Sequence, residues 1–407
     1  MNHIAPLSDR DIVAFSNDWS GDPLSKMHIM RLLSTDNRIL WVNSIGNRTP
    51  RANAHDLKRM WNKVSSFAKG LQEVEPNIYV LAPLALPFYG SASVRIANGE
   101  LLRAQIRRAM KHLRFSRPIS WSFLPASAPV SGRLGEELVI YHCVDEFSAF
   151  ADTKGEHIAE LEAKLLARAD LVIASAERLF ERKRAQNPNT VLVKHGVDFQ
   201  HFVKACDEST QVPPELAKLP KPVLGFFGLL AHWVDLAAIE ACARAFPSGS
   251  VVILGKVAPD VDPSSLQALP NVHFLGRKPY AQLPAYCRGF DVALMPFKLN
   301  ELTLNANPLK MREYLAAGLP CVSTDMPEVR RLGLCRLAAG PADFPHLVDD
   351  CLREGPGPSR ERAELIAGES WGARVAEIRA HVGEALARIS EAARRGSGDW
   401  STADTAA

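Results

Sequence analysis

The sequence lacks the signatures of several protein classes. Its seven cysteines are an odd number without a Cys-x-x-Cys pair, which argues against a disulfide framework and a zinc ribbon. No apolar run approaches the ~20 residues of a membrane-spanning helix, and the first residues show no charged-then-apolar signal segment. The net charge of +3 is too small to indicate nucleic-acid binding. These absences predict a cytoplasmic globular protein with no nucleic-acid partner.

A glycine-rich dinucleotide motif is also missing. That motif requires Gly-x-Gly-x-x-Gly directly after the first strand of a βαβ unit. Here Gly225-Phe-Phe-Gly228 lies in or at the end of an expected strand and has no third glycine. The sequence therefore argues against an NAD-dependent oxidoreductase.

The pattern that is present predicts an α/β protein. A chain of 407 residues is long enough for two domains of ordinary size. Short apolar runs alternate with helical periodicity, and such continuous apolar strands are typical of buried parallel sheets. The strands that we expect are 11–16, 39–42, 78–81, 119–123, 138–143, 171–174 and 191–194 in the first half, then 223–228, 250–254, 272–275, 292–296 and 320–324.

Composition also predicts the domain boundaries. The polar, proline-rich segment 207–222 is expected to link a first domain (1–206) to a second (223–371). An amphipathic helix over 372–393 has no strand after it. The composition of 394–407 predicts a disordered tail.

The segment 305–324 carries the most information about function. A helix is expected from Leu309 to Ala317, with Asn307-Pro308 before it and Gly318 after it. Its N-terminus would present backbone N–H groups and a positive dipole end to an anion such as phosphate. Lys310 in the first turn opposes that dipole, and a bound anion would remove the conflict. The alternative is a surface helix whose lysine and glutamate are solvated.

This segment resembles the donor-binding segment of retaining, nucleotide-sugar-dependent glycosyltransferases with the GT-B fold, of the family 4 and family 1 type found in bacterial surface-polysaccharide synthesis. The resemblance covers roughly residues 10–330 and is strongest over 165–198 and 223–329. It implies two Rossmann-like domains whose parallel sheets face each other across a cleft. The first would bind the acceptor and the second the nucleotide, with helix 372–393 crossing back to the first.

The resemblance also implies a set of site residues. Transfer of a sugar from a nucleoside diphosphate to an acceptor hydroxyl, on a sugar or a lipid-linked molecule, would use Asp145, Lys310 and Glu313 as catalytic residues. Glu313 would receive the ribose hydroxyls, and Lys310 the charge of the departing diphosphate, so that no metal or other cofactor is expected. The donor-binding residues implied are Gly228, His232, Gly255, Arg277, Glu301, Asn305, Asn307, Pro308 and Leu309. Those on the acceptor side of the cleft are Asp18, Gly21, His142 and His195, although His195 could instead belong to a structural turn.

The chain departs from the family pattern at three places. A histidine that many relatives carry after the strand 119–123 is absent. Many relatives carry a glutamate where this chain has Asn305, so Glu301 is the candidate substitute. Many also carry an arginine and a lysine in the stretch 229–235, where only His232 could be cationic here. Two other functions therefore stay open: a nucleotide-sugar 2-epimerase of the same fold, and a non-catalytic binding subunit that resembles a glycosyltransferase.

The segment 101–117 contains six Arg or Lys residues and no acid. Leu102, Ile106, Met110 and Leu113 form one helical stripe, with basic residues beside it. One hypothesis is that this helix contacts an anionic membrane, at the inner face of the plasma membrane, or a lipid-diphosphate acceptor. The other is an amphipathic domain helix with a solvated basic face.

Overall fold

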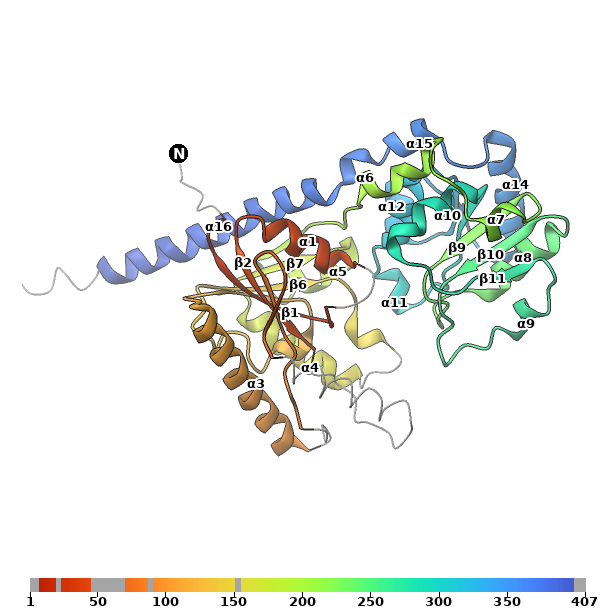
Figure 1. Cartoon of the computed structure of the whole chain (residues 1–407). Coiled ribbons are helices and arrows are strands. Elements are labelled where there is room, and N and C mark those ends of the chain that lie inside the picture. Colours follow the sequence, from red (N-terminus) through yellow and green to blue (C-terminus); the bar gives the residue numbers. More distant parts are fainter. Residues whose placement is uncertain (1–6, 20–22, 45–69, 87–90, 151–154, 399–407) are drawn as a thin grey trace, which may run out of the picture. The chain divides into compact units, whose positions relative to one another are not determined.

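The computed structural model describes residues 7–19, 23–44, 70–86, 91–150 and 155–398. The chain forms two compact units, Met1–Val193 with Val375–Ala407 and Lys194–Arg374 (Figure 1). Each unit contains a largely parallel sheet with helices packed against it, so the predicted α/β class is confirmed. Gly21 lies outside the described residues.

The sheet of the first unit reverses its strand order at β1. Its order is β3-β4-β2-β1-β5-β6-β7-β8, and neighbouring strands are parallel except for β3 and β4. Its strands are β1 (Asp11–Ser16), β2 (Arg38–Asn43), β3 (Gln72–Glu75), β4 (Ile78–Leu81), β5 (Ile119–Ser122), β6 (Leu138–Cys143), β7 (Leu171–Ala174) and β8 (Thr190–Leu192). Open parallel sheets bind ligands at the carboxyl ends of strands where the order reverses. In this unit that point lies between β1 and β5.

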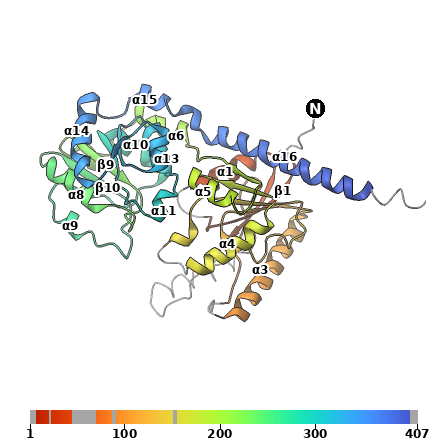
Figure 2. The same ribbon diagram turned by 180° about the vertical axis from the view of Figure 1, so that it is seen from behind.

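Helices cover both faces of this sheet. They are α1 (Ser25–Leu33), α3 (Ala92–Leu113), α4 (Gly155–Arg168), α5 (Glu177–Arg184) and α16 (Trp371–Gly398), which belongs to the first unit from Val375 onward. Figures 1 and 2 show α3 and α4 on one face and α1 and α16 on the other. The two faces of the sheet are therefore both buried, which explains why its central strands are apolar throughout.

The apolar stripe of helix α3 is part of the core. Leu102, Ile106 and Met110 are 4%, 0% and 7% exposed and pack against apolar residues of β1 and β2. Arg107 and Lys111 are exposed on the opposite side of the helix. The apolar stripe is therefore not exposed to a membrane, because it packs against the sheet. Contact of the outward basic face with an anionic membrane stays a prediction. The helix is an amphipathic domain helix with an outward basic face.

The sheet of the second unit has the order β11-β10-β9-β12-β13-β14, with every neighbouring pair parallel. Its strands are β9 (Val223–Phe227), β10 (Ser250–Leu254), β11 (Val272–Phe274), β12 (Val292–Met295), β13 (Cys321–Thr324) and β14 (Arg336–Ala338). Numbered within the unit, this is the 3-2-1-4-5-6 order of a doubly wound fold. The reversal falls between β9 and β12.

The helices of the second unit connect these strands. They are α6 (Phe199–Phe202), α7 (Pro214–Ala217), α8 (Leu236–Ala245), α9 (Ser264–Gln267), α10 (Leu283–Gly289), α11 (Glu301–Leu304), α12 (Leu309–Ala316), α13 (Pro327–Leu332), α14 (Phe344–Glu354) and α15 (Arg360–Glu364). One continuous apolar core runs beneath them. Within the described ranges, no helix is both long and apolar enough to span a bilayer.

The units do not divide where composition changes. The chain leaves the first unit after Val193, and the segment 207–222 belongs to the second unit. Leu216 in that segment is 2% exposed, and the Tyr286 hydroxyl donates to the Glu215 carboxylate at 2.5 Å. The segment is thus packed, although its composition resembles a linker. Residues 394–398 continue helix α16 instead of beginning a tail, and the rest of that predicted tail lies outside the described residues.

We predict that Gly225→Ala destabilises the second unit. A Cβ at this position of β9 would lie 2.1 Å from the nearest carbon of the buried Phe290 ring, so the ring or the strand must move. Overpacking of this kind costs about 1–3 kcal/mol. The urea midpoint of unfolding should fall relative to the native protein. Gly340→Ala is the matched control, because a Cβ there meets nothing within 4 Å. Equal midpoints for the two variants would contradict this packing.

Candidate functional site

Three glycines follow neighbouring strands at one edge of the second sheet. Gly228, Gly255 and Gly276 come after β9, β10 and β11, with φ angles of +131°, +152° and +69°. The N–H of Gly255 donates to the carbonyl of Gly276 at 2.9 Å. A Cβ on Gly255 would lie 1.8 Å from the carbonyl oxygen of Gly228, so a side chain does not fit there. Bare backbone at this edge permits the close approach of a ligand.

The side chain of Lys310 lies directly against the first of these glycines, Gly228. A Cβ placed on Gly228 would lie 1.9 Å from Lys310 Cε and 2.6 Å from its Nζ. The same Nζ lies 5.7 Å from the centre of the Phe297 ring, which follows β12. The structure therefore brings together Lys310 and Gly228, both predicted from sequence, at the carboxyl ends of β9 and β12. This is the point where the strand order reverses.

Helix α12 supplies Lys310 and Glu313 from its first turns. It begins at Leu309 after Pro308, close to the expected position, and no side chain caps its N-terminus. Its Tyr314 hydroxyl accepts a hydrogen bond from the backbone N–H of Phe227 at 2.9 Å, which fixes the helix to the end of β9. Burial lowers the pKa of Lys310, while the negative charge of Glu313 acts to raise it. An anion bound at this helix N-terminus would offset the cost of burying the Lys310 charge.

The loop before α12 is held by buried polar contacts. The ring nitrogen Nδ1 of His195 lies 2.9 Å from the carbonyl oxygen of Asn307. Arg312, which is 1% exposed, donates to Asn307 Oδ1 at 2.5 Å and forms an ion pair with Glu369 at 3.3 Å. Glu369 also pairs with Arg374 at 2.5 Å. His195 thus lies in the second unit beside the predicted donor loop, although the sequence analysis assigns it to the acceptor side.

Asn305 and Glu301 occupy different environments. The Asn305 side chain is 0% exposed, and its Nδ2 donates to the carbonyl of Glu301 at 2.6 Å, within the turn that ends α11. Glu301 itself is exposed at the start of α11. A buried Asn305 shapes the turn, whereas the Glu301 carboxylate is accessible. This is the arrangement that a substitute carboxylate would need.

Two further predicted donor residues lie at the same strand ends. His232 follows β9, and its Nδ1 lies 3.5 Å from a carboxylate oxygen of Asp260. Arg277 follows Gly276 and is exposed. The described contacts do not connect either residue with Lys310. Their participation in a site therefore remains a prediction.

In the first unit, Asp145 lies beside a lysine that the sequence analysis missed. Lys26, in the first turn of α1, is 6% exposed, and its Nζ donates to Asn17 Oδ1 at 2.6 Å. Burial raises the pKa of Asp145 to about 6, and the charge of Lys26 opposes this rise. Burial likewise lowers the pKa of Lys26 to about 8, against the attraction of Asp145. Asp145 and Lys26 follow β6 and β1, near the point of strand reversal. Asp18, in the loop after β1, is exposed.

His142 and Glu146, on either side of Asp145, point into the protein. His142 is 1% exposed, its Nδ1 lies 3.4 Å from Trp121 Nε1, and its ring centre is 5.1 Å from that of Phe123. His142 is therefore buried in strand β6, and its predicted place on the acceptor side of a cleft stays a prediction. Glu146 is 2% exposed and pairs with Lys183 at 3.4 Å. Of the two adjacent carboxylates, only Asp145 is partly exposed.

Lys26 and Arg312 gave little signal in the sequence. Both lie on helices in which polar and apolar residues alternate, and in such a pattern a lysine or arginine is expected to face solvent. An indication was available for Lys26, since a lysine in the first turn of a helix opposes the dipole, as Lys310 does.

Across the described ranges, no group of three or more His, Cys, Asp or Glu side chains is placed to hold a metal ion.

Comparisons with known proteins match this arrangement. The family described as "Glycosyl transferases group 1" matches residues 221–353. A candidate teichuronic acid biosynthesis glycosyltransferase, TuaH of Bacillus subtilis (strain 168), is 27% identical over 228 residues. That alignment covers 52% of this chain and 56% of the relative, so the chain spans little more than half of the relative's length.

Solved structures extend the likeness over nearly the whole chain. The sucrose-phosphate synthase of Thermosynechococcus elongatus has a TM-score of 0.61 at 14% identity, covering 91% of this chain and 97% of its own. The Burkholderia multivorans trehalose 6-phosphate synthase has a TM-score of 0.62 at 13% identity, covering 95% and 100%. Anabaena HepE, solved with UDP-glucose, has a TM-score of 0.59 at 14% identity, covering 95% and 99%. Residues 221–353 thus match the group 1 glycosyl transferase family, and the chain has the GT-B fold of these solved structures.

Proposed function

We propose that this protein is a glycosyltransferase that moves a sugar from a nucleoside diphosphate donor to an acceptor hydroxyl, with retention of configuration. The observation that carries the proposal is the position of Lys310 over Gly228, at the N-terminus of α12 and at the reversal point of the second sheet. The family match over 221–353 supports it. So does the likeness to HepE, whose structure contains UDP-glucose.

The proposed chemistry depends on where charge accumulates. As the glycosidic bond to the donor breaks, negative charge grows on the departing diphosphate. Fixed positive groups act most strongly on such developing charge. Lys310 and the backbone N–H groups at Leu309 would stabilise it, and Glu313 would accept the ribose hydroxyls. We propose that this step proceeds without a metal ion or other cofactor.

On the acceptor side we propose Asp145 as the proton acceptor. A carboxylate with a pKa of about 6 is mostly ionised at neutral pH and is a stronger base than an ordinary aspartate. The Bacillus relative is named for teichuronic acid synthesis, which favours a polysaccharide or lipid-linked acceptor. We propose that the protein acts in the cytoplasm, at the inner face of the membrane where such acceptors would be available.

The first experiment separates the proposed activity from its alternatives. A thermal-shift screen with UDP, GDP, ADP and TDP identifies the nucleotide, because a ligand that binds the native state raises the melting temperature. The protein is then incubated with the matching labelled nucleotide sugars and candidate acceptors. A transferase releases the nucleoside diphosphate and labels the acceptor. An epimerase changes the sugar without labelling an acceptor, and a binding subunit does neither.

We predict that Lys310→Ala lowers kcat by roughly 10²–10³-fold and changes KM much less. The reason is that the ammonium group stabilises charge that is larger in the transition state than in the bound donor. Steady-state kinetics at saturating acceptor measure both constants. Lys218→Ala is the control, because this exposed lysine of the second unit is outside the site. An unchanged kcat with a raised KM would show that Lys310 only binds the donor.

We predict that Glu313→Ala weakens nucleoside diphosphate binding by about 1.5–3 kcal/mol, measured by isothermal titration calorimetry. The variant should also lose turnover. Because Glu313 raises the pKa of Lys310, its removal should move the alkaline limb of the rate profile, if activity remains, to lower pH. Glu364→Ala, an exposed carboxylate variant, should bind normally. Native affinity in Glu313→Ala would exclude this residue from the site.

We predict that the catalytic rate falls as the pH drops through about 6, because Asp145 then becomes protonated and can no longer accept a proton. Lys26→Met should shift this acid limb to higher pH, since the positive charge of Lys26 lowers the pKa of Asp145. Carboxyl ¹³C NMR of both proteins reports the same pKa directly. A limb that stays in place in Lys26→Met would mean that another group controls it.

A further inference from the structure

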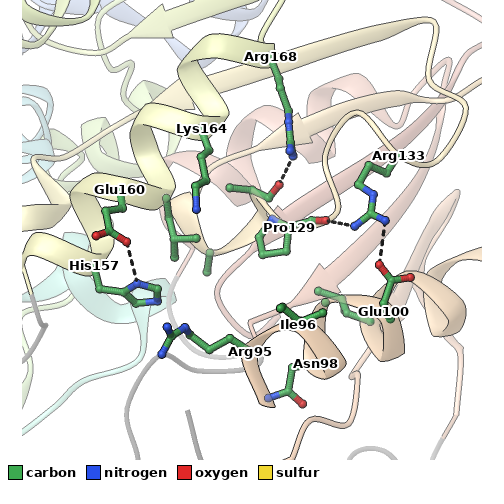
Figure 3. Close-up of a pocket in the computed structure, with 15 residues that line it drawn as sticks. Arg95, Ile96, Asn98, Glu100, Pro129, Arg133, His157, Glu160, Lys164 and Arg168 are labelled. Atoms are coloured by element: carbon green, nitrogen blue, oxygen red, sulfur yellow. Dashed lines mark hydrogen bonds and ion pairs between the residues drawn. The ribbon is translucent and has the colours of Figure 1, made fainter. Parts of the chain in front are cut away.

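A pocket lies in the first unit, between α3, the turn after β5, and α4. Its volume is about 500 Å³, within the ~300–1,000 Å³ range of small-molecule sites. Its floor is apolar and its rim is charged. The residues that line it are Arg95, Ile96, Asn98, Gly99, Glu100, Leu102, Ala126, Ala128, Pro129, Arg133, His157, Glu160, Leu161, Lys164 and Arg168 (Figure 3).

The lining carries an excess of positive charge. It contains four permanent cations and two carboxylates, which leaves a net charge of +2 when His157 is neutral. Each carboxylate already has a neighbouring side chain: Glu100 pairs with Arg133 at 2.8 Å, and Glu160 lies 3.8 Å from His157 Nδ1. The excess is therefore not compensated by the carboxylates of the pocket.

The cationic side chains of the pocket differ in the hydrogen bonds that fix them. Arg168 donates to the carbonyl of Ala128 at 2.6 Å, and Arg133 to that of Pro129 at 3.2 Å, so both are fixed to the turn after β5. Lys164 makes no hydrogen bond or ion pair within the described part of the chain. Figure 3 shows Lys164 pointing from α4 into the space between the helices and Arg95 entering it from α3.

Apolar surface continues from the floor to the outside. Leu102, Ala128 and Pro129 line the interior of the pocket. Ile96, on its α3 wall, is 70% exposed, and Leu101 on the same helix is 38% exposed. Of these two side chains Ile96 lines the pocket, where it adds exposed apolar surface to the interior, and such apolar lining is typical of small-molecule sites.

We propose that this pocket binds an amphiphilic anion, a phosphate or diphosphate carried on a hydrocarbon chain. Lys164 and Arg95 bind the phosphate groups, and the chain lies along the floor and over Ile96. A phosphate monoester carries about −1.5 to −2 charges at neutral pH, which matches the excess of the lining. The proposal is independent of the nucleotide site of the second unit, since every lining residue belongs to the first unit.

The test uses geranyl diphosphate as the probe, with inorganic diphosphate and geraniol as its two separate halves. Binding to the full-length protein is measured by isothermal titration calorimetry in the presence of the saturating nucleotide identified by thermal shift, which occupies the second unit. We expect geranyl diphosphate to bind at least tenfold more tightly than either half. Equal affinity for inorganic diphosphate would overturn the proposal, because the pocket would then recognise charge alone. So would an absence of binding.

Variants place the binding in the pocket. Arg95→Glu combined with Lys164→Glu should weaken geranyl diphosphate binding by at least tenfold. The matched control is Arg108→Glu with Lys111→Glu, which changes the net charge equally on exposed residues of α3 that do not line the pocket. It should bind within about twofold of the native protein. An equal loss in both pairs would overturn the proposal, because it would indicate general electrostatic attraction.

Two further variants guard against effects on folding. Ile96→Ser replaces an exposed side chain and should weaken geranyl diphosphate binding while leaving inorganic diphosphate unaffected. Lys310→Ala, in the second unit, should leave geranyl diphosphate binding unchanged. If Lys310→Ala instead abolished it, the probe would be binding at the nucleotide site and the pocket proposal would fail, whereas the proposed transferase activity would stand.

Discussion

A buried guanidinium group determines the shape of the loop that precedes α12. Arg312 is 1% exposed and bonds on one side to Asn307 and on the other to Glu369. Desolvating such a charge is expensive, so the arrangement is stable only while both partners are present. Because His195 holds the backbone of the same Asn307, the loop has little freedom. Lys310 and the N-terminus of α12 are positioned by the loop that Arg312 holds.

Contacts close to Glu369 join the two ends of the second unit. Val197, close to where the chain enters this unit, forms a β-bridge with Ser370, close to where it leaves. Gly196 lies against the backbone of Trp371, where a Cβ would come within 2.8 Å. Glu369 therefore connects the loop before α12 to the two places where the chain enters and leaves the second unit.

The strands were predictable from sequence, but the burial of single polar side chains was not. Each expected strand is present to within two residues at either end, because buried parallel strands are continuous apolar runs. The structure adds β3 and β14, which have no such run: β3 reads Gln-Glu-Val-Glu. The α12 segment was predictable because its start and stop signals are local. The environments of Lys26, His142 and Arg312 depend on residues far away in the chain, and no local pattern encodes them.

Strand β3 also affects how the protein behaves at high concentration. Among the described strands it forms an edge of the first sheet, where unpaired backbone groups could join a strand of another chain. Two of its four residues are glutamates, and its pairing with β4 shifts register between Glu73 and Glu75. Charge and irregular register both hinder the addition of a further strand. The segment that sequence patterns overlook as a strand thus protects the sheet from aggregation along this edge.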